Sequence, residues 1–249
     1  MLYSLFTHDC LSCHVHTKIL KFSDDTTVIG LITNSDESEY REQVNKLISW
    51  CNDKNLELNI SKTKELIVDF RRQKSSPPSP LVIDGRTVEI VHHLKFLGST
   101  ISNNLKWELN VVNIVKKAQQ RLFFLRRLTS FGLTTQVMLN FYRAVIESLP
   151  TCFIIVWFLS ITQKETLRLN RVVETASQII GRDLPSLEVL YQQRLLGRAT
   201  LISQDSSHPA HDLFEPLPSS RRFRSIKTRT DRFSTSFFPL AVQTLSKQK

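Results

Sequence analysis

Residues Ile19–Gly30 read ILKFSDDTTVIG, and this stretch decides the fold of the first part of the chain. Its flanks are rich in Ile, Val, Phe and Thr, which favour strands, whereas the Ser and Asp residues between them favour a turn. The pattern therefore predicts a β-hairpin with Asp24 and Asp25 at its tip. Adjacent carboxylates repel each other, and Mg²⁺ would neutralise both because it binds hard oxygen ligands. Alternatively, the two aspartates are present only because Asp is a common turn residue.

Helical signals follow the hairpin. The segment from Asn34 to Asp36 offers a helix start, and Asp36 with Glu39 three residues later matches a capping box. Apolar residues then recur at helical spacing, at Tyr40, Val44, Leu47, Ile48 and Cys51. The sequence therefore predicts an amphipathic helix directly after the hairpin.

Three β signals come next. Residues 65–70 read ELIVDF, which is strand-like, and residues 81–88 read LVIDGRTV, a hairpin with an Asp-Gly turn. Residues 91–98 read VHHLKFLG and predict a further strand. The predicted order is hairpin, helix, strand, hairpin and strand.

Taken together, these segments resemble the reverse transcriptase of a non-LTR (LINE-type) retrotransposon. Four motifs carry the resemblance in the family's order: FSDD at 22–25, NISKTK at 59–64, HLKFLG at 93–98 and the helical KKAQQRLFFLRRL at 116–128. In the family the first two belong to the palm, the third grips the primer end and the fourth belongs to the thumb. Ser23 departs from the family pattern, in which Ala is usual.

The resemblance implies roles for particular residues. Asp24 and Asp25 would be catalytic ligands of Mg²⁺, because carboxylates on a sheet hold the metal ions in nucleotidyl transfer. Lys64 or Lys62 would lie near the pyrophosphate leaving group. Lys95, in the primer-gripping strand, would contact nucleic acid.

The resemblance also implies an α+β fold class in three parts. These are a partial polymerase palm of β-hairpins plus a helix at 1–104, a helical thumb-like region at 105–200, and a Ser/Pro linker with a basic, partly disordered tail at 201–249.

Parts of the family's catalytic site have no counterpart in this sequence. In the family the Asp-Asp pair acts with a third metal-binding aspartate and a Gly-rich nucleotide-selecting segment, both N-terminal to it. Here residues 1–21 precede the Phe22-Ser23 start of the motif, and Asp9 is their only acidic residue. We therefore expect a remnant of an RNA-directed DNA polymerase that is inactive by itself. The alternative is a reverse transcriptase that is active as part of a longer chain.

Positive charge is concentrated in the second part of the chain. The formal net charge is +10; residues 1–104 hold 12 Lys and Arg against 13 Asp and Glu, whereas residues 105–249 hold 21 against 10. This asymmetry predicts contacts with the phosphates of RNA or DNA, without sequence preference. A solvated basic surface is the alternative.

The predicted phosphate-binding residues form two clusters. The cluster at 116–128 lies opposite an apolar helix face made of Val111, Val115, Ala118, Leu122 and Leu125. The cluster at 221–229 suits nucleic acid or nuclear import, or is only a disordered tail. With the primer-gripping lysine, the candidate binding residues are Lys95, Lys116, Lys117, Arg121, Arg126, Arg127, Arg221, Arg222 and Arg224.

The rest of the second part is predicted from hydrophobic pattern. Residues 149–161 are strongly apolar but too few to span a bilayer, which takes about 20 residues, so they predict a buried helix and no membrane partner. Residues 167–180 predict an amphipathic helix ended by Gly181, and residues 187–196 predict one more. Residues 203–220, rich in Ser, Pro and His, predict a linker.

Two short similarities point elsewhere. Cys10–His14 reads CLSCH, a haem-attachment pattern, but no axial ligand or secretory setting accompanies it and chance explains it better. The helical stretch is also similar to the N-terminal segment of AlkB-type alkylation-repair and tRNA-modifying proteins, without a dioxygenase His-x-Asp pair or a methyl-donor loop. Four irregularly spaced cysteines and no signal-peptide pattern indicate an intracellular protein, cytoplasmic or nuclear.

Overall fold

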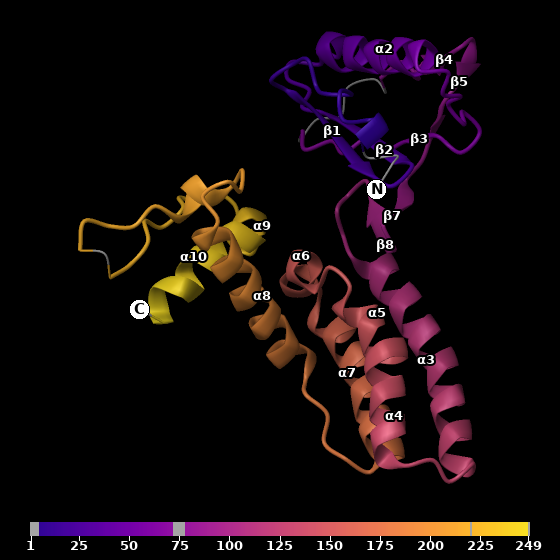
Figure 1. Cartoon of the computed structure of the whole chain (residues 1–249), viewed down its shortest axis with the longest axis vertical. Coiled ribbons are helices and arrows are strands. Elements are labelled where there is room, and N and C mark those ends of the chain that lie inside the picture. Colours follow the sequence, from indigo (N-terminus) through magenta and orange to yellow (C-terminus); the bar gives the residue numbers. More distant parts are fainter. Residues whose placement is uncertain (1–4, 72–77, 220, 249) are drawn as a thin grey trace. The chain divides into compact units, whose positions relative to one another are not determined.

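The computed structural model describes residues 5–71, 78–219 and 221–248, and the chain divides into two compact units, Met1–Val91 and His92–Lys249. Helices and small two-stranded sheets follow one another along the chain (Figure 1). The mixture agrees with the predicted α+β class at that coarse level. Each unit has its own hydrophobic core.

The first unit begins with the predicted hairpin. Strand β1 (Thr17–Phe22) pairs antiparallel with β2 (Asp25–Gly30), and Phe22 lies opposite Asp25. Ser23 and Asp24 therefore form a two-residue tip, in which Ser23 has a left-handed φ of 55°. The strand-forming flanks and the polar turn between them explain this geometry, and the prediction is confirmed.

Helix α2 (Ser38–Asp53) follows, but the predicted capping box is wrong. The residue before the helix is Glu37, so Glu39 stands one position too early to complete a box with it. Asp36 instead accepts hydrogen bonds on Oδ1 from the Ser38 amide and hydroxyl, at 3.0 and 2.6 Å. The apolar side of α2 packs on a small core of four buried residues, Val44, Leu81, Ile83 and Val88.

Four two-residue strands complete the first unit: β3 (Lys64–Glu65), β4 (Val82–Ile83), β5 (Arg86–Thr87) and β6 (Glu89–Ile90). The predicted Asp-Gly hairpin is confirmed, because β4 pairs with β5 around Asp84 and Gly85, whose φ values are 48° and 73°. The predicted strand at 65–70 is wrong beyond Glu65. Its partner in the described part of the chain, β6, is only two residues long, and the ladder ends with it.

The second unit starts with a hairpin of β7 (His93–Phe96) and β8 (Ser99–Ser102), of which the first arm was predicted. Thr100 ties the hairpin to the following helix. Its amide donates to Asn110 Oδ1 at 3.0 Å, and Asn113 Nδ2 donates to its Oγ1 at 3.1 Å. The hairpin belongs with the helices of the second unit, which begins at His92.

Helices make up the remainder of the second unit. They are α3 (Glu108–Ser130), α4 (Thr135–Phe141), the π-helix η1 (Tyr142–Glu147), α5 (Ser148–Thr151), α6 (Ile154–Trp157), the 3₁₀ helix η2 (Phe158–Ser160), α7 (Gln163–Ile180), α8 (Leu187–Gln204), the 3₁₀ helix η3 (His211–Phe214), α9 (Asp231–Ser234) and α10 (Phe237–Gln248). Helix α3 packs along α7, and α10 packs on α8 (Figure 1).

The helices predicted at 116–128, 167–180 and 187–196 are present. The apolar side chains expected on one face of α3 are all buried, and Val111, Ala118 and Leu125 have no exposed surface. Helix α7 starts with a capping box between Thr162 and Glu165 and ends at Gly181, whose φ of 72° suits glycine. Helix α8 continues to Gln204, beyond the predicted 187–196.

The apolar stretch at 149–161 is not one helix. Phe153 has a left-handed φ of 50°, which interrupts the helical hydrogen bonding and separates α5 from α6. In the described part of the chain, Thr135–Ser160 is the one helical run that passes a length and composition test for a membrane span. Core helices pass the same test, and here Tyr142 and Trp157 are buried in the unit's core.

The last part of the predicted basic, partly disordered tail forms a helix, whereas the basic segment at 221–229 is irregular. Helix α10 buries Ala241, Val242 and Leu245 against the core of the second unit, and Phe214 of the predicted linker is also buried. The Phe223 amide donates to Ser246 Oγ at 3.0 Å. Helix α10 follows the basic segment at 221–229 and the short helix α9, and its apolar spacing was the available signal.

Candidate nucleic-acid interface

The paired aspartates lie at the exposed tip of the first hairpin. Asp24 is in the turn and Asp25 opens β2, and both are exposed. Among the described residues, no group of three or more His, Cys, Asp or Glu side chains is placed to hold a metal ion.

One face of this hairpin is uncovered and apolar. Because side chains alternate along strands, Leu20 and Phe22 share a face with Ile29 across the ladder, and they are 46, 64 and 41% exposed. The opposite face carries Val28, which packs on the small core beneath α2. Asp25, opposite Phe22, belongs to the uncovered face.

Lys64 is paired with a carboxylate in this structure. Its ammonium forms an ion pair with Glu89 of the neighbouring strand, with Nζ and Oε2 2.5 Å apart. It also donates to the Ser61 carbonyl at 3.3 Å. Lys62, the other lysine of this motif, is exposed.

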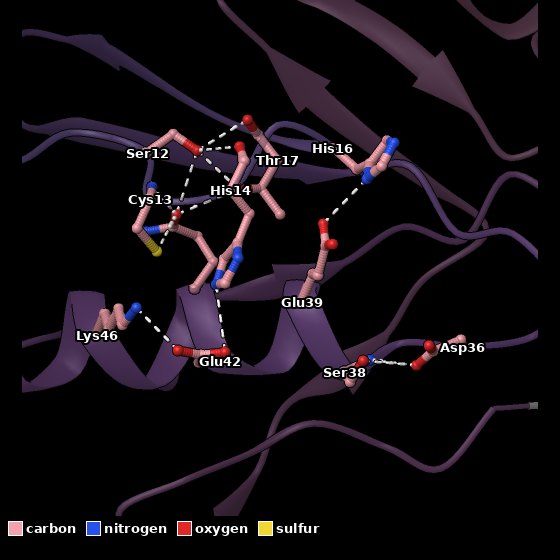
Figure 2. A network of polar contacts seen from close by, with 11 residues as sticks. Ser12, Cys13, His14, His16, Thr17, Asp36, Ser38, Glu39, Glu42 and Lys46 are labelled. Atoms are coloured by element: carbon pink, nitrogen blue, oxygen red, sulfur yellow. Dashed lines mark hydrogen bonds and ion pairs between the residues drawn. The ribbon is translucent and has the colours of Figure 1, made fainter.

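Gln43 fixes the segment that leads into the hairpin. Its side chain is 1% exposed, and Oε1 accepts hydrogen bonds from the Cys13 amide at 2.8 Å and the Thr17 hydroxyl at 3.2 Å. Figure 2 shows the surrounding network, in which His14 and His16 reach Glu42 and Glu39 of α2 at 3.4 and 3.1 Å.

The CLSCH segment therefore serves packing. Cys10 is buried, and burial raises the pKa of its thiol while the nearby Lys21 ammonium lowers it. Lys21 donates to the backbone carbonyls of Thr7 and Cys10. These contacts hold the segment against β1.

The basic face of α3 is the clearest cluster of predicted binding residues. Lys116, Lys117, Arg126 and Arg127 are exposed, and Glu108 is the only acidic residue of the helix. In the described part of the chain, no carboxylate forms an ion pair with any of these four side chains. Their positive charge is therefore available to a polyanion.

Arg121 does not belong to this exposed face. It is half-buried, and its guanidinium donates to the Val145 carbonyl in η1. The predicted phosphate contact of Arg121 would have to use the guanidinium donors that this bond leaves open. Arginine at this position joins α3 to the π-helix, a role that helical spacing could not indicate.

The structure adds aromatic residues that the sequence reasoning missed. Phe123 and Phe124 lie between the two lysines and the two arginines of α3 and are 57 and 56% exposed. Their ring centroids are 5.7 Å apart with an interplanar angle of 74°. Their positions outside the apolar stripe of α3 were the available signal.

The other predicted binding residues are also at the surface of the second unit. Lys95 is exposed on β7, opposite Thr100. Arg221 and Arg222 are exposed in an irregular segment, whereas Arg224 forms an ion pair with Glu215 at 3.2 Å. Arg224 is therefore partly neutralised.

Comparison with known proteins adds one short match. A family described as alkylated DNA repair protein alkB homolog 8, N-terminal, matches residues 107–148, which hold α3, α4 and η1. The match covers well under half of the chain. No curated protein and no solved structure matches this chain.

Proposed function

We propose that this chain is the palm-to-thumb part of a non-LTR retrotransposon reverse transcriptase that binds RNA or DNA without sequence preference. By itself it does not synthesise DNA, and it acts inside the cell, in the cytoplasm or nucleus. The observation that carries the proposal is the exposed face of α3, whose cations have no acidic partners among the described residues.

The order of the four motifs supports this origin, and a hairpin around Asp24 and Asp25 is compatible with the family's palm motif. The uncovered face with Leu20 and Phe22 is what a palm sheet would leave exposed without its neighbouring elements. A two-stranded hairpin also has unpaired edges, which in a larger sheet would be hydrogen-bonded.

Binding would rest on phosphate contacts. Exposed Lys and Arg side chains neutralise phosphates and release counterions, which gives affinity without base recognition. The proposed binding contains no catalytic step.

Binding is tested by titrating the full chain against a labelled RNA–DNA hybrid at several salt concentrations. Lys116→Gln with Lys117→Gln should weaken binding and reduce the log–log salt slope by about 1.4 to 1.8, since each contact contributes about 0.7 to 0.9. The matched control, Lys164→Gln with Lys247→Gln, removes two exposed charges outside α3 and should leave affinity nearly unchanged. An equal loss of affinity in both double variants would show that the basic face of α3 is only a solvated surface.

Polymerase activity is tested separately by primer extension with Mg²⁺ or Mn²⁺. No extension is expected, because loss of groups that stabilise the transition state costs several powers of ten. Template-dependent synthesis that disappears in Asp24→Asn would contradict this part of the proposal. It would favour the alternative of an active polymerase.

A further inference from the structure

Three phenylalanines interrupt the basic surface of α3. Phe123 and Phe124 are more than half exposed, and Phe131, directly after the helix, is 70% exposed. Large aromatic side chains are usually buried, and a group of them on one surface marks a binding site. These rings are not buried in the core of the unit, so a bound ligand would explain their exposure.

The rings and the cations lie on the same side of the helix. Lys116, Gln120, Phe123 and Arg127 are spaced by four, three and four residues, which places them along one ridge. The Arg127 guanidinium lies over the Phe131 ring, 5.9 Å from its centroid. From residue 116 to 131 the strip is about 22 Å long at the helical rise per residue.

We infer that this strip takes single-stranded RNA or DNA in preference to a duplex, with bases stacked on Phe123 and Phe124. The inference rests on the proposed nucleic-acid binding and specifies its ligand. Lys116, Lys117 and Arg127 contact the phosphates on either side of the stacked bases.

The aromatic rings are what distinguish the two ligands. Phosphates are available in single strands and in duplexes alike, so the cations alone favour neither. Base faces are covered in a duplex and open in a single strand, where stacking on aromatic side chains contributes to affinity without sequence preference.

Charge argues against a protein partner at the same place. An apolar protein surface covering Phe123 and Phe124 would also remove the flanking lysines and Arg127 from water without compensation. In a single-stranded nucleic acid the phosphates pair with the cations while the bases stack on the rings.

The experiment compares a labelled single-stranded oligo(dT) and oligo(U) with a blunt duplex of equal length. Phe123→Leu with Phe124→Leu keeps apolar, helix-forming side chains but removes the rings. Affinity for the single strands should fall about tenfold or more, as loss of stacking predicts, while duplex affinity changes less than twofold. Phe70→Leu, which removes a 73% exposed ring from the first unit, is the matched control and should change neither.

A second variant reports stacking directly. Phe124→Trp should lose tryptophan fluorescence when oligo(dT) is added, relative to the parent chain, and should keep it with the duplex. Circular dichroism checks that both α3 variants retain their helix content, so that a folding defect is not mistaken for lost stacking.

The outcomes separate the two proposals. If the parent chain binds neither probe, nucleic-acid binding and the single-strand inference fall together. If it binds both and the double leucine variant changes neither affinity, or lowers both equally, only the single-strand inference is overturned. The same holds if that variant leaves binding intact but changes the mass of the protein in solution, since the rings would then form a protein interface.

Discussion

Gln43 is the side chain that most clearly stabilises the first unit. It is buried, and its one amide oxygen accepts hydrogen bonds from Ser12, Cys13 and Thr17. Gln43→Ala removes the acceptor of the Cys13 amide, whereas the Ser12 and Thr17 hydroxyls can still donate to the Thr17 and His14 carbonyls. Loss of this buried acceptor costs about 1 to 3 kcal/mol of unfolding free energy. Urea unfolding measures the loss. Asn45→Ala, on the exposed side of α2, should stay within about 0.5 kcal/mol, and an equal effect of both would refute the role of Gln43.

Ser23 is strained at the hairpin tip, because its φ of 55° is unfavourable for a residue with a Cβ atom. Ser23→Gly should relieve this strain and raise the unfolding free energy by about 0.5 to 1 kcal/mol. Ser23→Ala keeps the Cβ atom and should give no gain. A loss of thermal stability in the glycine variant would mean that the serine hydroxyl is needed there.

The π-helix η1 contains a carboxylate in an unfavourable environment. Burial raises the pKa of Glu147, and the nearby Arg143 and Arg194 only partly oppose this. A carboxyl whose folded pKa is raised destabilises the fold when it is charged, fully above the folded pKa and not at all below the unfolded value of about 4.3.

Glu147→Gln should therefore stabilise the second unit at pH 7, by less than about 1 kcal/mol because solvent screens a partly exposed group. The gain should disappear on acidification below about pH 4. Thermal unfolding at both pH values tests this, with Glu174→Gln on the exposed side of α7 as control. A gain that persists in acid would show that charge is not the cause.

The two cores predict that the chain unfolds in two parts. Leu245→Ala removes a buried side chain from the contact of α10 with α8. It should lower the free energy of unfolding of the His92–Lys249 unit by about 2 kcal/mol and leave that of the first unit unchanged. Gln43→Ala should lower the free energy of unfolding of the Met1–Val91 unit alone. Of the chain's three tryptophans, Trp50 belongs to the first unit, so fluorescence of Trp50→Phe follows the second unit alone. A single transition moved equally by both variants would contradict separate cores.

Local signals in the sequence determined the hairpins and most helices, because their causes lie within a few residues. The Asp84-Gly85 turn, the Ser-Asp tip of the first hairpin and the apolar spacing of α3 all act at short range. The α7 end at Gly181 was predictable for the same reason.

Only the tertiary structure decided which of the candidate cations form hydrogen bonds or ion pairs within the protein. Arg121 bonds to a carbonyl 24 residues away, and Lys64 pairs with Glu89, 25 residues away, across β3 and β6. The docking of α10 depends on a partner helix, α8, from which residues 205–236 separate it. Such contacts form between segments distant in the chain, so residue type and spacing could not show which cations would be neutralised and which rings would stay exposed.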